Sequence, residues 1–413
     1  MSAVPAEVDV LVVGGGPAGL SAAAAAAARG ASVHVVERNA AIGEPVRTSG
    51  GSFIAPMRAL GVPREMLHPV KSLRLVGPGH ELVFRRSRAM ACVIDVRGTY
   101  QHLAARAADS GAGITLRASV SGPLTGPDGR VRGVRLRTGE EIRARHVVDS
   151  SGSVALAARA VGARHGADRR AVGVEWEVHA PRYDQDEALL AVGDEIAPGG
   201  YAWAFPCGRD RVRLGVGVVR PDSDADPQRL LETLVDAVPS LASCRHSAPL
   251  EIHAGVMPAM APDAVRLVSP GLVVAGDAGG QGSTLLGEGI RYSIIAGRMA
   301  GDAVGRAVSR PDREAEELGV YPRRWHASVG RQMRAGWLMH GRLCAYSDDD
   351  WRRVLAVVSR LTAWQVMAVL AGSLDYRLAA NLVLTRPGLV VGEGRALLRA
   401  ALARPGAEPS GRV

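Results

Sequence analysis

The 413-residue chain contains little cysteine, and its cysteines are far apart. The four thiols stand at Cys92, Cys207, Cys244 and Cys344, so no CxxC pair occurs, and no HExxH pattern is present either. Zinc knuckles, redox dithiols and helical zinc sites each need closely spaced ligands. The sequence therefore predicts no metal centre and no redox dithiol, and it favours a reducing, cytoplasmic compartment.

Long hydrophobic runs are also missing. No stretch approaches the ~20 consecutive apolar residues that a membrane-spanning helix needs. A secretory signal would need a basic start, whereas Glu7 and Asp9 precede the short apolar segment 10–13. The sequence therefore predicts a cytoplasmic protein. Docking of an amphipathic C-terminal tail on a membrane surface, to collect a lipid substrate, stays open as an alternative.

Lysine is nearly absent although the chain is basic. Lys and Arg total 50 against 41 acidic residues, which gives a net charge of +9, yet Lys71 is the only lysine. The arginines are scattered, and only 4% of the residues are aromatic. Nucleic-acid recognition needs a basic face with interleaved aromatic side chains. The sequence therefore predicts a solvated basic surface and no nucleic-acid partner.

A glycine-rich turn near the N-terminus is the first feature that points to a function. The apolar segment 8–13 reads as a strand, the turn 14–19 follows it, and the Ala-rich run 21–29 reads as a helix. This arrangement lets the backbone approach a pyrophosphate and aims a helix N-terminus at it. A second strand, 31–36, ends at a carboxylate that can accept both ribose hydroxyls. The predicted dinucleotide contacts are Gly14, Gly16, Pro17, Ala18, Gly19, Glu37 and Arg38.

A second glycine cluster lies far along the chain. Gly276 and Asp277 end an apolar strand that begins at Leu272, and Gly287, Gly289 and Ile290 stand at the start of a helix that runs to about residue 308. A carboxylate there can bond a ribityl chain, and a helix N-terminus stabilises negative charge on a reduced flavin. Together the two glycine clusters favour FAD over NAD.

The remaining pattern predicts two further regions. Alternation of apolar and polar residues across 171–219 is typical of antiparallel strands, and 73–76 and 82–84 are candidates for the same sheet. From residue 314 onward the pattern is mostly helical, with an N-cap cluster at 347–350. We therefore expect an α/β fold with a discontinuous Rossmann-type FAD-binding domain (1–70, 90–165 and 255–320), an inserted antiparallel-sheet substrate domain (71–89 and 166–254) and a helical C-terminal region (321–413).

Four stretches of the chain resemble one family of flavoproteins. They are the turn 14–19 with Glu37 and Arg38, the segment 43–47 (GEPVR), the segment 199–206 (GGYAWAFP), and 276–292. The third is similar to the YxWxFP signature of the geranylgeranyl reductase family, which shares the p-hydroxybenzoate-hydroxylase-like fold. The resemblance covers roughly residues 5–330.

The resemblance implies FAD-dependent reduction of an isolated carbon–carbon double bond in an isoprenoid chain, by hydride transfer from flavin N5. The substrate would be a prenyl lipid, a prenylated quinone or a terpenoid natural product, and NAD(P)H or a small redox protein would supply the electrons. It also implies an arginine near the flavin phosphates at Arg97 and a backbone contact to the adenine at Val120. The reaction chamber would be lined by Arg47, Thr48, Tyr201, Trp203 and Phe205, and the first two would also touch FAD.

The chain departs from the family at two places, and other functions stay open. Family members often carry a cysteine where this chain has Thr48, and an Asn-Pro pair where it has Ser283 and Thr284. The alternative is a monooxygenase or another flavin-dependent tailoring enzyme of natural-product biosynthesis on the same fold. The DGxxSxxR fingerprint of the hydroxylases is incomplete, however, since Ala155 and Ala158 replace its serine and arginine. A halogenase lysine at Lys71 and a flavin-binding protein without catalytic activity are further alternatives.

Overall fold

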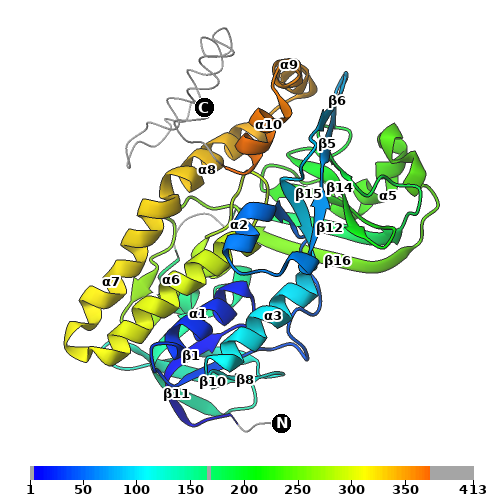
Figure 1. The fold of residues 1–413 in the computed structure, drawn as a ribbon. Helices are drawn as coiled ribbons and strands as arrows, with labels where there is room; N and C mark the ends of the chain where they lie inside the picture. The colour runs from blue at the N-terminus through cyan, green and yellow to red at the C-terminus, as the bar shows by residue number, and fades with distance from the viewer. Residues whose placement is uncertain (1–3, 165–168, 373–413) are drawn as a thin grey trace.

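The computed structural model describes residues 4–164 and 169–372 (Figure 1). Its first sheet has eight strands, five of which run parallel in the order β18-β11-β1-β2-β8. These are β18 (Leu272–Val274), β11 (Glu141–Asp149), β1 (Glu7–Val13), β2 (Val33–Val36) and β8 (Gly113–Thr115). Strands β17 (Val268–Ser269), β10 (Val131–Leu136) and β9 (Val120–Thr125) add antiparallel pairs. The apolar runs fit this position because parallel strands are covered on both faces.

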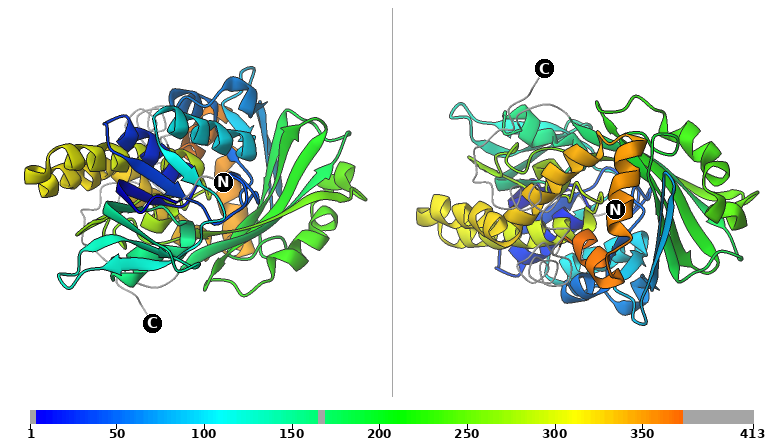
Figure 2. Two further views of the ribbon diagram at one scale, coloured as in Figure 1. Left: turned by 90° about the horizontal axis from the view of Figure 1, so that it is seen from below. Right: turned by 90° about the horizontal axis from the view of Figure 1, so that it is seen from above.

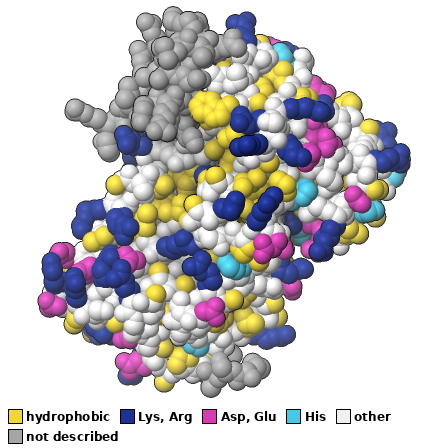
Figure 3. All heavy atoms as spheres, in the orientation of Figure 1, with side chains coloured by type: hydrophobic (Ala, Val, Ile, Leu, Met, Phe, Trp, Pro, Cys, Tyr) yellow, Lys and Arg dark blue, Asp and Glu magenta, His cyan; other side chains and the backbone are white. Residues whose placement is uncertain are grey.

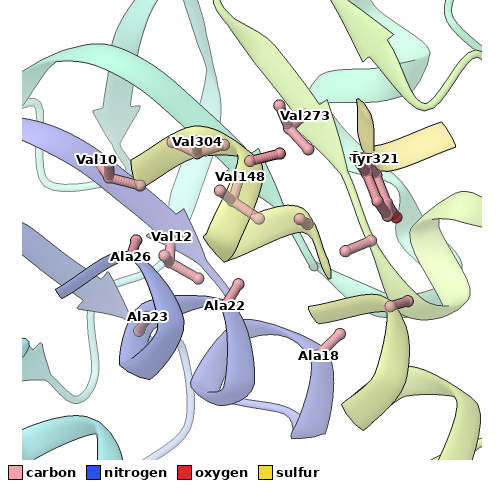
Figure 4. Close-up of a cluster of buried hydrophobic side chains, with 14 of the residues drawn as sticks. Val10, Val12, Ala18, Ala22, Ala23, Ala26, Val148, Val273, Val304 and Tyr321 are labelled. Carbon is pink, nitrogen blue, oxygen red and sulfur yellow. The ribbon is translucent and has the colours of Figure 1, made fainter. Parts of the chain in front are cut away.

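The Ala-rich run forms α1 (Pro17–Ala27), which packs against α6 (Ile290–Ser309). A side chain at Gly297 or Gly301 of α6 would collide with the backbone of α1 at Ala18 or Ala22, so small residues on both helices allow close contact. Figure 4 shows their apolar side chains meeting those of β1, β11 and β18. α3 (Val96–Asp109) and α7 (Glu314–Trp325) complete this layer, and η5 (Pro311–Arg313) connects α6 to α7.

The second sheet has seven strands in the order β16-β12-β15-β14-β13-β5-β6. Their bounds are β16 (Pro249–Pro258), β12 (Arg170–His179), β15 (Arg211–Arg220), β14 (Gly200–Gly208), β13 (Glu187–Ala191), β5 (Ser72–Gly77) and β6 (His80–Arg85). All neighbours are antiparallel except β13 and β5, where the chain segment before residue 90 joins the segment after 170. One face packs on α5 (Pro227–Ala237) and η3 (Pro239–Cys244), which leaves the other face to line a cavity.

A third, small sheet is formed by chain segments that precede and follow β5 and β6 of the second sheet. It consists of β3 (Gly51–Phe53), β7 (Ala91–Ile94) and β4 (Leu67–Val70), with α2 (Ile54–Ala59) and η1 (Arg64–Met66) beside it. The sequence pattern did not predict this sheet, because its strands are three or four residues long and too short to show a periodicity. Short helical turns η2 (Gly152–Val154), α4 (Leu156–Ala160) and η4 (Gly276–Gly279) follow the ends of parallel strands.

The C-terminal helices are α8 (Arg331–Leu343), α9 (Asp348–Val358) and α10 (Ala363–Leu370), and a π-helical turn at His326–Gly330 joins α7 to α8. The predicted N-cap is confirmed: Ser347 and Asp350 form a capping box at α9. In the view from above, the orange helices lie across the junction of the two larger sheets (Figure 2). The expected helical region beyond residue 372 lies outside the described residues. Within the described ranges, no helix has the length and apolar character to cross a membrane.

Candidate active site

A cavity of about 1040 Å³ lies between the first sheet, the inner face of the second sheet and helices α8 to α10. Small-molecule sites typically enclose about 300–1,000 Å³, so this cavity is slightly larger than that range. Its wall combines the glycine-rich turn after β1, the loop 43–49, the strands β12, β14 and β16, and the turn before α6. Segments more than 250 residues apart in the sequence therefore face one space.

The glycine-rich turn is shaped by contacts that leave no room for side chains. Gly14 has φ +108°, and a Cβ there would lie 2.5 Å from the carbonyl oxygen of Ser150. A Cβ at Gly19 would collide with the carbonyl oxygen of Gly14. Gly16, in contrast, has open space around its Cα and faces the cavity. The turn thus presents bare backbone and the N-terminus of α1 to whatever occupies this end.

Glu37 closes the same end of the cavity and is almost fully buried. Its Oε2 accepts a hydrogen bond from the Gly15 amide (2.7 Å), and its Oε1 accepts one from the Asn39 amide (2.8 Å). Each carboxylate oxygen keeps a further lone pair, because an ionised carboxylate has about four acceptor sites. The side chain is therefore held in place and can still accept hydrogen bonds from the two hydroxyls of a ribose.

The turn before α6 adds two polar groups that fit a dinucleotide. Burial raises the pKa of Asp277 to about 6, and its carboxyl faces the cavity beside Gly289, the N-cap residue of α6. The hydroxyl of Thr284 is buried on the cavity wall and has no hydrogen-bond partner among the described residues. Buried polar groups are normally paired, so both side chains fit the polar edge of a bound cofactor such as FAD.

The predicted strand at 272–277 is shorter than expected. β18 ends at Val274, and residues 276–279 form a helical turn that starts at Gly276 with φ +70°. This turn directs the Asp277 carboxyl into the cavity, whereas Gly276 itself packs against Ala18 of α1.

Most of the residues predicted for the site come together at the cavity wall. They are Gly14, Gly16, Pro17, Ala18, Glu37, Arg38, Arg47, Thr48, Val120, Tyr201, Trp203, Asp277, Gly287, Gly289 and Ile290. Gly19 and Gly276 lie just behind it, at the contacts of α1. Arg97 is not on the wall; it forms ion pairs with Glu44 (2.9 Å) and Glu251 (3.8 Å). Phe205 lies in a smaller adjoining cavity of about 90 Å³, which shares Thr48 and Tyr201 with the large one.

The aromatic side chains of β14 share one face, as the period of two predicts. The ring centroids of Tyr201 and Trp203 are 5.6 Å apart, and those of Trp203 and Phe205 are 6.3 Å apart. The Tyr201 hydroxyl donates a hydrogen bond to the carbonyl oxygen of Leu286 (2.6 Å), and burial raises the pKa of this phenol. Tyr201 therefore stays neutral and ties β14 to the loop before α6.

Trp203 lies against a patch of the sheet that carries no side chains. Its ring is 3.4 Å from where a Cβ would stand at Gly173 and at Gly217, and a Cβ at Gly215 would collide with it. The indole Nε1–H donates to Glu175 Oε2 (2.7 Å). The glycines and the carboxylate together fix the ring as a flat, apolar wall of the cavity.

Sequence reasoning missed a group of charged side chains beside this wall. Glu175 and His253 are both almost fully buried, line the cavity and are cross-strand partners on β12 and β16. Their hydrogen bond joins Glu175 Oε1 to His253 Nδ1 (2.9 Å). The available signal was the charged residues at positions 175 and 177 of an otherwise apolar strand. Strand alternation places both acidic side chains on the face of the second sheet opposite to the one that packs on α5 and η3.

The C-terminal helices supply most of the far wall, which no motif predicted. The lining residues from this region are Met339, His340, Leu343, Cys344, Trp351, Val354, Val358, Val369 and Leu370. His340 Nε2 and the Cys344 thiol are 3.5 Å apart; burial lowers the pKa of His340 to about 4 and raises that of Cys344 to about 11. Both groups are therefore neutral near pH 7, and this part of the wall is uncharged.

The loop that carries Thr48 packs directly on the second sheet. A side chain at Gly255 of β16 would collide with the Arg47 carbonyl oxygen. Thr48 stands where the two cavities meet. In the part of the chain that the structure describes, no group of three or more His, Cys, Asp and Glu side chains is arranged to hold a metal ion.

Two protein families match the chain. One, described as FAD dependent oxidoreductase, matches residues 9–200, and the other, described as geranylgeranyl reductase catalytic domain, matches residues 171–257. Among curated relatives, the digeranylgeranylglycerophospholipid reductase of Methanothrix thermoacetophila is 30% identical over 84% of this chain and 90% of its own length. One from Methanopyrus kandleri is 32% identical over 77% of this chain and 86% of its own length.

Solved structures with the same fold include a geranylgeranyl bacteriochlorophyll reductase-like protein from Thermoplasma acidophilum. It has a TM-score of 0.82 and 23% identity, over 95% of this chain and 99% of that one. A flavin-dependent brominase is similar with a TM-score of 0.63 and 16% identity, over 80% and 87% of the two chains. The family matches, the identity to the curated reductases and the cavity agree, and the chain belongs to the geranylgeranyl reductase family of FAD-dependent oxidoreductases.

Proposed function

We propose that this protein binds FAD and saturates carbon–carbon double bonds of an isoprenoid chain. The observation that carries the proposal is that one large cavity joins two kinds of wall: one end is a cradle of bare backbone that suits a dinucleotide, and the other end has an apolar wall built by β14 and helices α8 to α10. The named relatives are reductases of digeranylgeranylglycerophospholipids, which makes a prenyl lipid the first substrate class to test.

FAD would lie along the turn 14–19, with its ribose on Glu37 and its flavin end near Asp277 and the N-terminus of α6. Gly14, Gly16, Pro17 and Ala18 would expose their backbone to the pyrophosphate, and Val120 would contact the adenine. When bound and reduced by the electron donor, FAD would supply the hydride for this reaction. Arg97 does not line the cavity, so its influence on the cofactor would be indirect. It would hold Glu44, its ion-pair partner, in place on the cavity wall.

The substrate would lie between the aromatic residues of β14 and the C-terminal helices. An isolated alkene offers no polar group to hold, so orientation has to come from apolar walls and exclusion of water. Trp203 is fixed by its hydrogen bond and by the glycines under it, and Tyr201 is fixed by Leu286. Arg47 and Thr48 would border the reacting carbon atoms, and Phe205 would support Tyr201 and Trp203 from the smaller cavity.

The electron donor would be NAD(P)H or a small redox protein that docks transiently, because the sequence contains no second glycine-rich βαβ unit. A cytoplasmic protein that touches the membrane at its periphery would suit a lipid substrate. Figure 3 supports such contact: hydrophobic side chains gather in the middle of one face and are bordered by Lys and Arg.

Segments 71–89 and 166–254 would form the substrate domain. The support for this division is that β5, β6 and β12 to β16 form one sheet. Only the last residues of β16 extend past that boundary.

The test is an anaerobic single turnover. The FAD-loaded protein is reduced with dithionite and mixed, without oxygen, with a digeranylgeranyl glycerophospholipid. We expect the substrate to reoxidise the flavin and to gain two hydrogen atoms for each bond reduced, as seen by mass spectrometry. A product that forms only after oxygen is admitted and carries an added oxygen atom would establish the monooxygenase instead. A protein that takes up no FAD would overturn the proposal.

A further inference from the structure

Three side chains on β12 and β16 form a continuous hydrogen-bonded chain from the surface to the cavity. His253 Nε2 is 3.1 Å from Glu251 Oε2, and His253 Nδ1 is 2.9 Å from Glu175 Oε1. The Glu251 side chain is 39% exposed, whereas those of His253 and Glu175 are 5% and 4% exposed. This hydrogen-bonded series therefore begins at Glu251 in solvent and ends at the buried His253–Glu175 pair, which lines the cavity.

The inner end of this chain meets the wall proposed for the substrate. Glu175 Oε2 accepts the hydrogen bond of the Trp203 indole, so one carboxylate joins the histidine to the aromatic wall. Register fixes this arrangement: Glu175 pairs with His253 on one side and with Gly215 on the other, and Gly215 pairs with Trp203.

The hydrogen bonds favour a protonated imidazole. Both neighbours of His253 are carboxylates, which only accept hydrogen bonds when ionised, so the imidazolium with two N–H donors satisfies both. Burial lowers the pKa of His253, but the hydrogen bonds to Glu175 and Glu251 outweigh it and raise the pKa above the ordinary 6.5. The hydrogen bond from His253 lowers the pKa of Glu251.

Other charged groups face these three hydrogen-bonded residues from each element packed against them. Arg213 on β15 opposes protonation of His253 and is bound to Glu177 on β12 (3.0 Å). Arg97 on α3 lies 3.8 Å from Glu251. The remaining ones are Arg211, bound to Glu177, and Glu44, bound to Arg97. The cations are paired with carboxylates of their own, so His253 can still take up a proton.

We propose that Glu251, His253 and Glu175 form a proton relay that supplies the proton for reduction of the substrate double bond. This inference rests on the proposed function. Saturation of an alkene breaks its π bond and forms two C–H bonds, with hydride from the reduced cofactor on one carbon and a proton on the other. The alkene is reduced and the cofactor is oxidised. The proton enters the cavity from the Glu175–His253 pair, and His253 recovers one from solvent through Glu251.

Other ionisable groups on the cavity wall are less suited to this step. Burial raises the pKa of Tyr201 and Cys344 and lowers that of His340, so these groups hold their protons or stay without one near pH 7. Asp277, with a pKa of about 6, lies at the start of α6 where the cofactor is expected, and no hydrogen bond recorded among the described residues links it to the surface.

The experiment compares His253→Gln with the parent holoenzyme in the anaerobic single turnover. Glutamine keeps hydrogen-bonding capacity and loses the titration, so we expect reoxidation by substrate to slow by about 100-fold or more, within the range for general acids, with FAD affinity unchanged. In the parent, the rate should fall as pH rises through the pKa of His253, and this dependence should vanish in the variant. His179→Gln, at an exposed site at the end of β12, is the matched control and should behave as the parent.

A second readout needs no substrate. NMR titration of the His253 ring in the holoenzyme should give a pKa above 6.5, and Glu175→Gln and Glu251→Gln should each lower it.

Should His253→Gln fail to fold, Glu251→Gln at the exposed end takes its place and should slow the turnover. A variant with the parental rate and pH profile overturns the relay, as does a His253 that is neutral throughout pH 5–8. If the parent itself reduces no prenyl substrate, the proposed function falls, and the relay as the proton source for that reduction falls with it. The NMR titration still shows whether His253 holds a proton in the Glu251–His253–Glu175 chain.

Discussion

The two ends of the cavity are built in different ways. At the end proposed for FAD, Gly14, Gly19 and Glu37 stand within one short βαβ segment, and their closest contacts are made with backbone atoms. At the end proposed for the substrate, Glu175, Trp203 and His253 come from three strands of the second sheet, and side chains contact side chains. A site made by local backbone geometry can be recognised as a motif, whereas a site made by strand register cannot.

The largest effect that would test this contrast is expected for Gly19→Val. The new side chain would collide with the Gly14 carbonyl and lie 2.5 Å or closer to Ser150 Oγ, so the turn cannot keep its shape. We expect protein without flavin absorbance and with a lower melting temperature, because overpacking costs about 1–3 kcal/mol. Gly16→Ala is the matched control. It meets no protein atom within 4 Å, so the FAD-free protein should melt as the parent does while FAD binds more weakly. Normal FAD content in Gly19→Val would contradict this account of the turn.

At the other end of the cavity, Gly215→Ala should displace the Trp203 ring. We expect FAD content to stay normal and single-turnover reduction of a prenyl substrate to fall about tenfold or more, which corresponds to ~1.4 kcal/mol. Gly217→Ala should have little effect, because its methyl group would stand 3.4 Å from the ring, an ordinary contact. Equal rates in the two variants would show that the ring position is unimportant.

Two alanine substitutions should affect FAD affinity and turnover independently, one at each end of the cavity. Glu37→Ala removes the acceptor of the Gly15 and Asn39 amides and of the ribose, and hydrogen bonds to a charged group contribute about 1.5–3 kcal/mol. FAD affinity, measured by calorimetry, should therefore fall about 10- to 100-fold. Trp203→Ala should keep FAD affinity and lose turnover. Full FAD affinity in Glu37→Ala would remove that residue from the cofactor site.

The smallest expected effect concerns Asp277 and pH. Burial raises its pKa to about 6 in the FAD-free protein, above the ordinary 3.8, so the folded state binds more protons than the unfolded state between these values. Its unfavourable contribution to stability therefore grows as pH rises from about 4 to 6. Asp277→Asn should melt at a higher temperature than the parent at pH 7, by a few degrees at most, and at the same temperature below pH 4. Thermal melts of FAD-free protein at both pH values check this, and a pH-independent difference would contradict the assignment.

Much of the fold could be read from the sequence because the patterns involved are local. The βαβ unit at the N-terminus, the alternating strands of the second sheet and the capping box at Ser347 follow from periodicity and turn chemistry within a few residues. The three-stranded sheet of β3, β4 and β7 did not, because its strands are too short for a periodicity to appear.

In the candidate site, too, the residues that lie within one element were predicted from the sequence, and those brought together from distant elements were not. The glycine turns and the stripe of Tyr201, Trp203 and Phe205 were visible in the sequence, since each lies within one element. Arg97, expected near the flavin phosphates, forms ion pairs with Glu44 and Glu251, which no motif indicated. The far wall from α8 to α10 carries no motif, because an apolar helix face looks the same whether it packs on protein or lines a cavity.

The sequence by itself determined the segment proposed to bind FAD, the family resemblance and the elements that form the two large sheets. These depend on contacts between residues close in the chain, or on a turn that only glycine can adopt. Only the tertiary structure decided which charged residues of β12 and β16 meet, and that Glu251, His253 and Glu175 join solvent to the cavity. The reason is physical: strand register and the packing of distant helices set these distances, and neither is encoded in any single stretch of the chain.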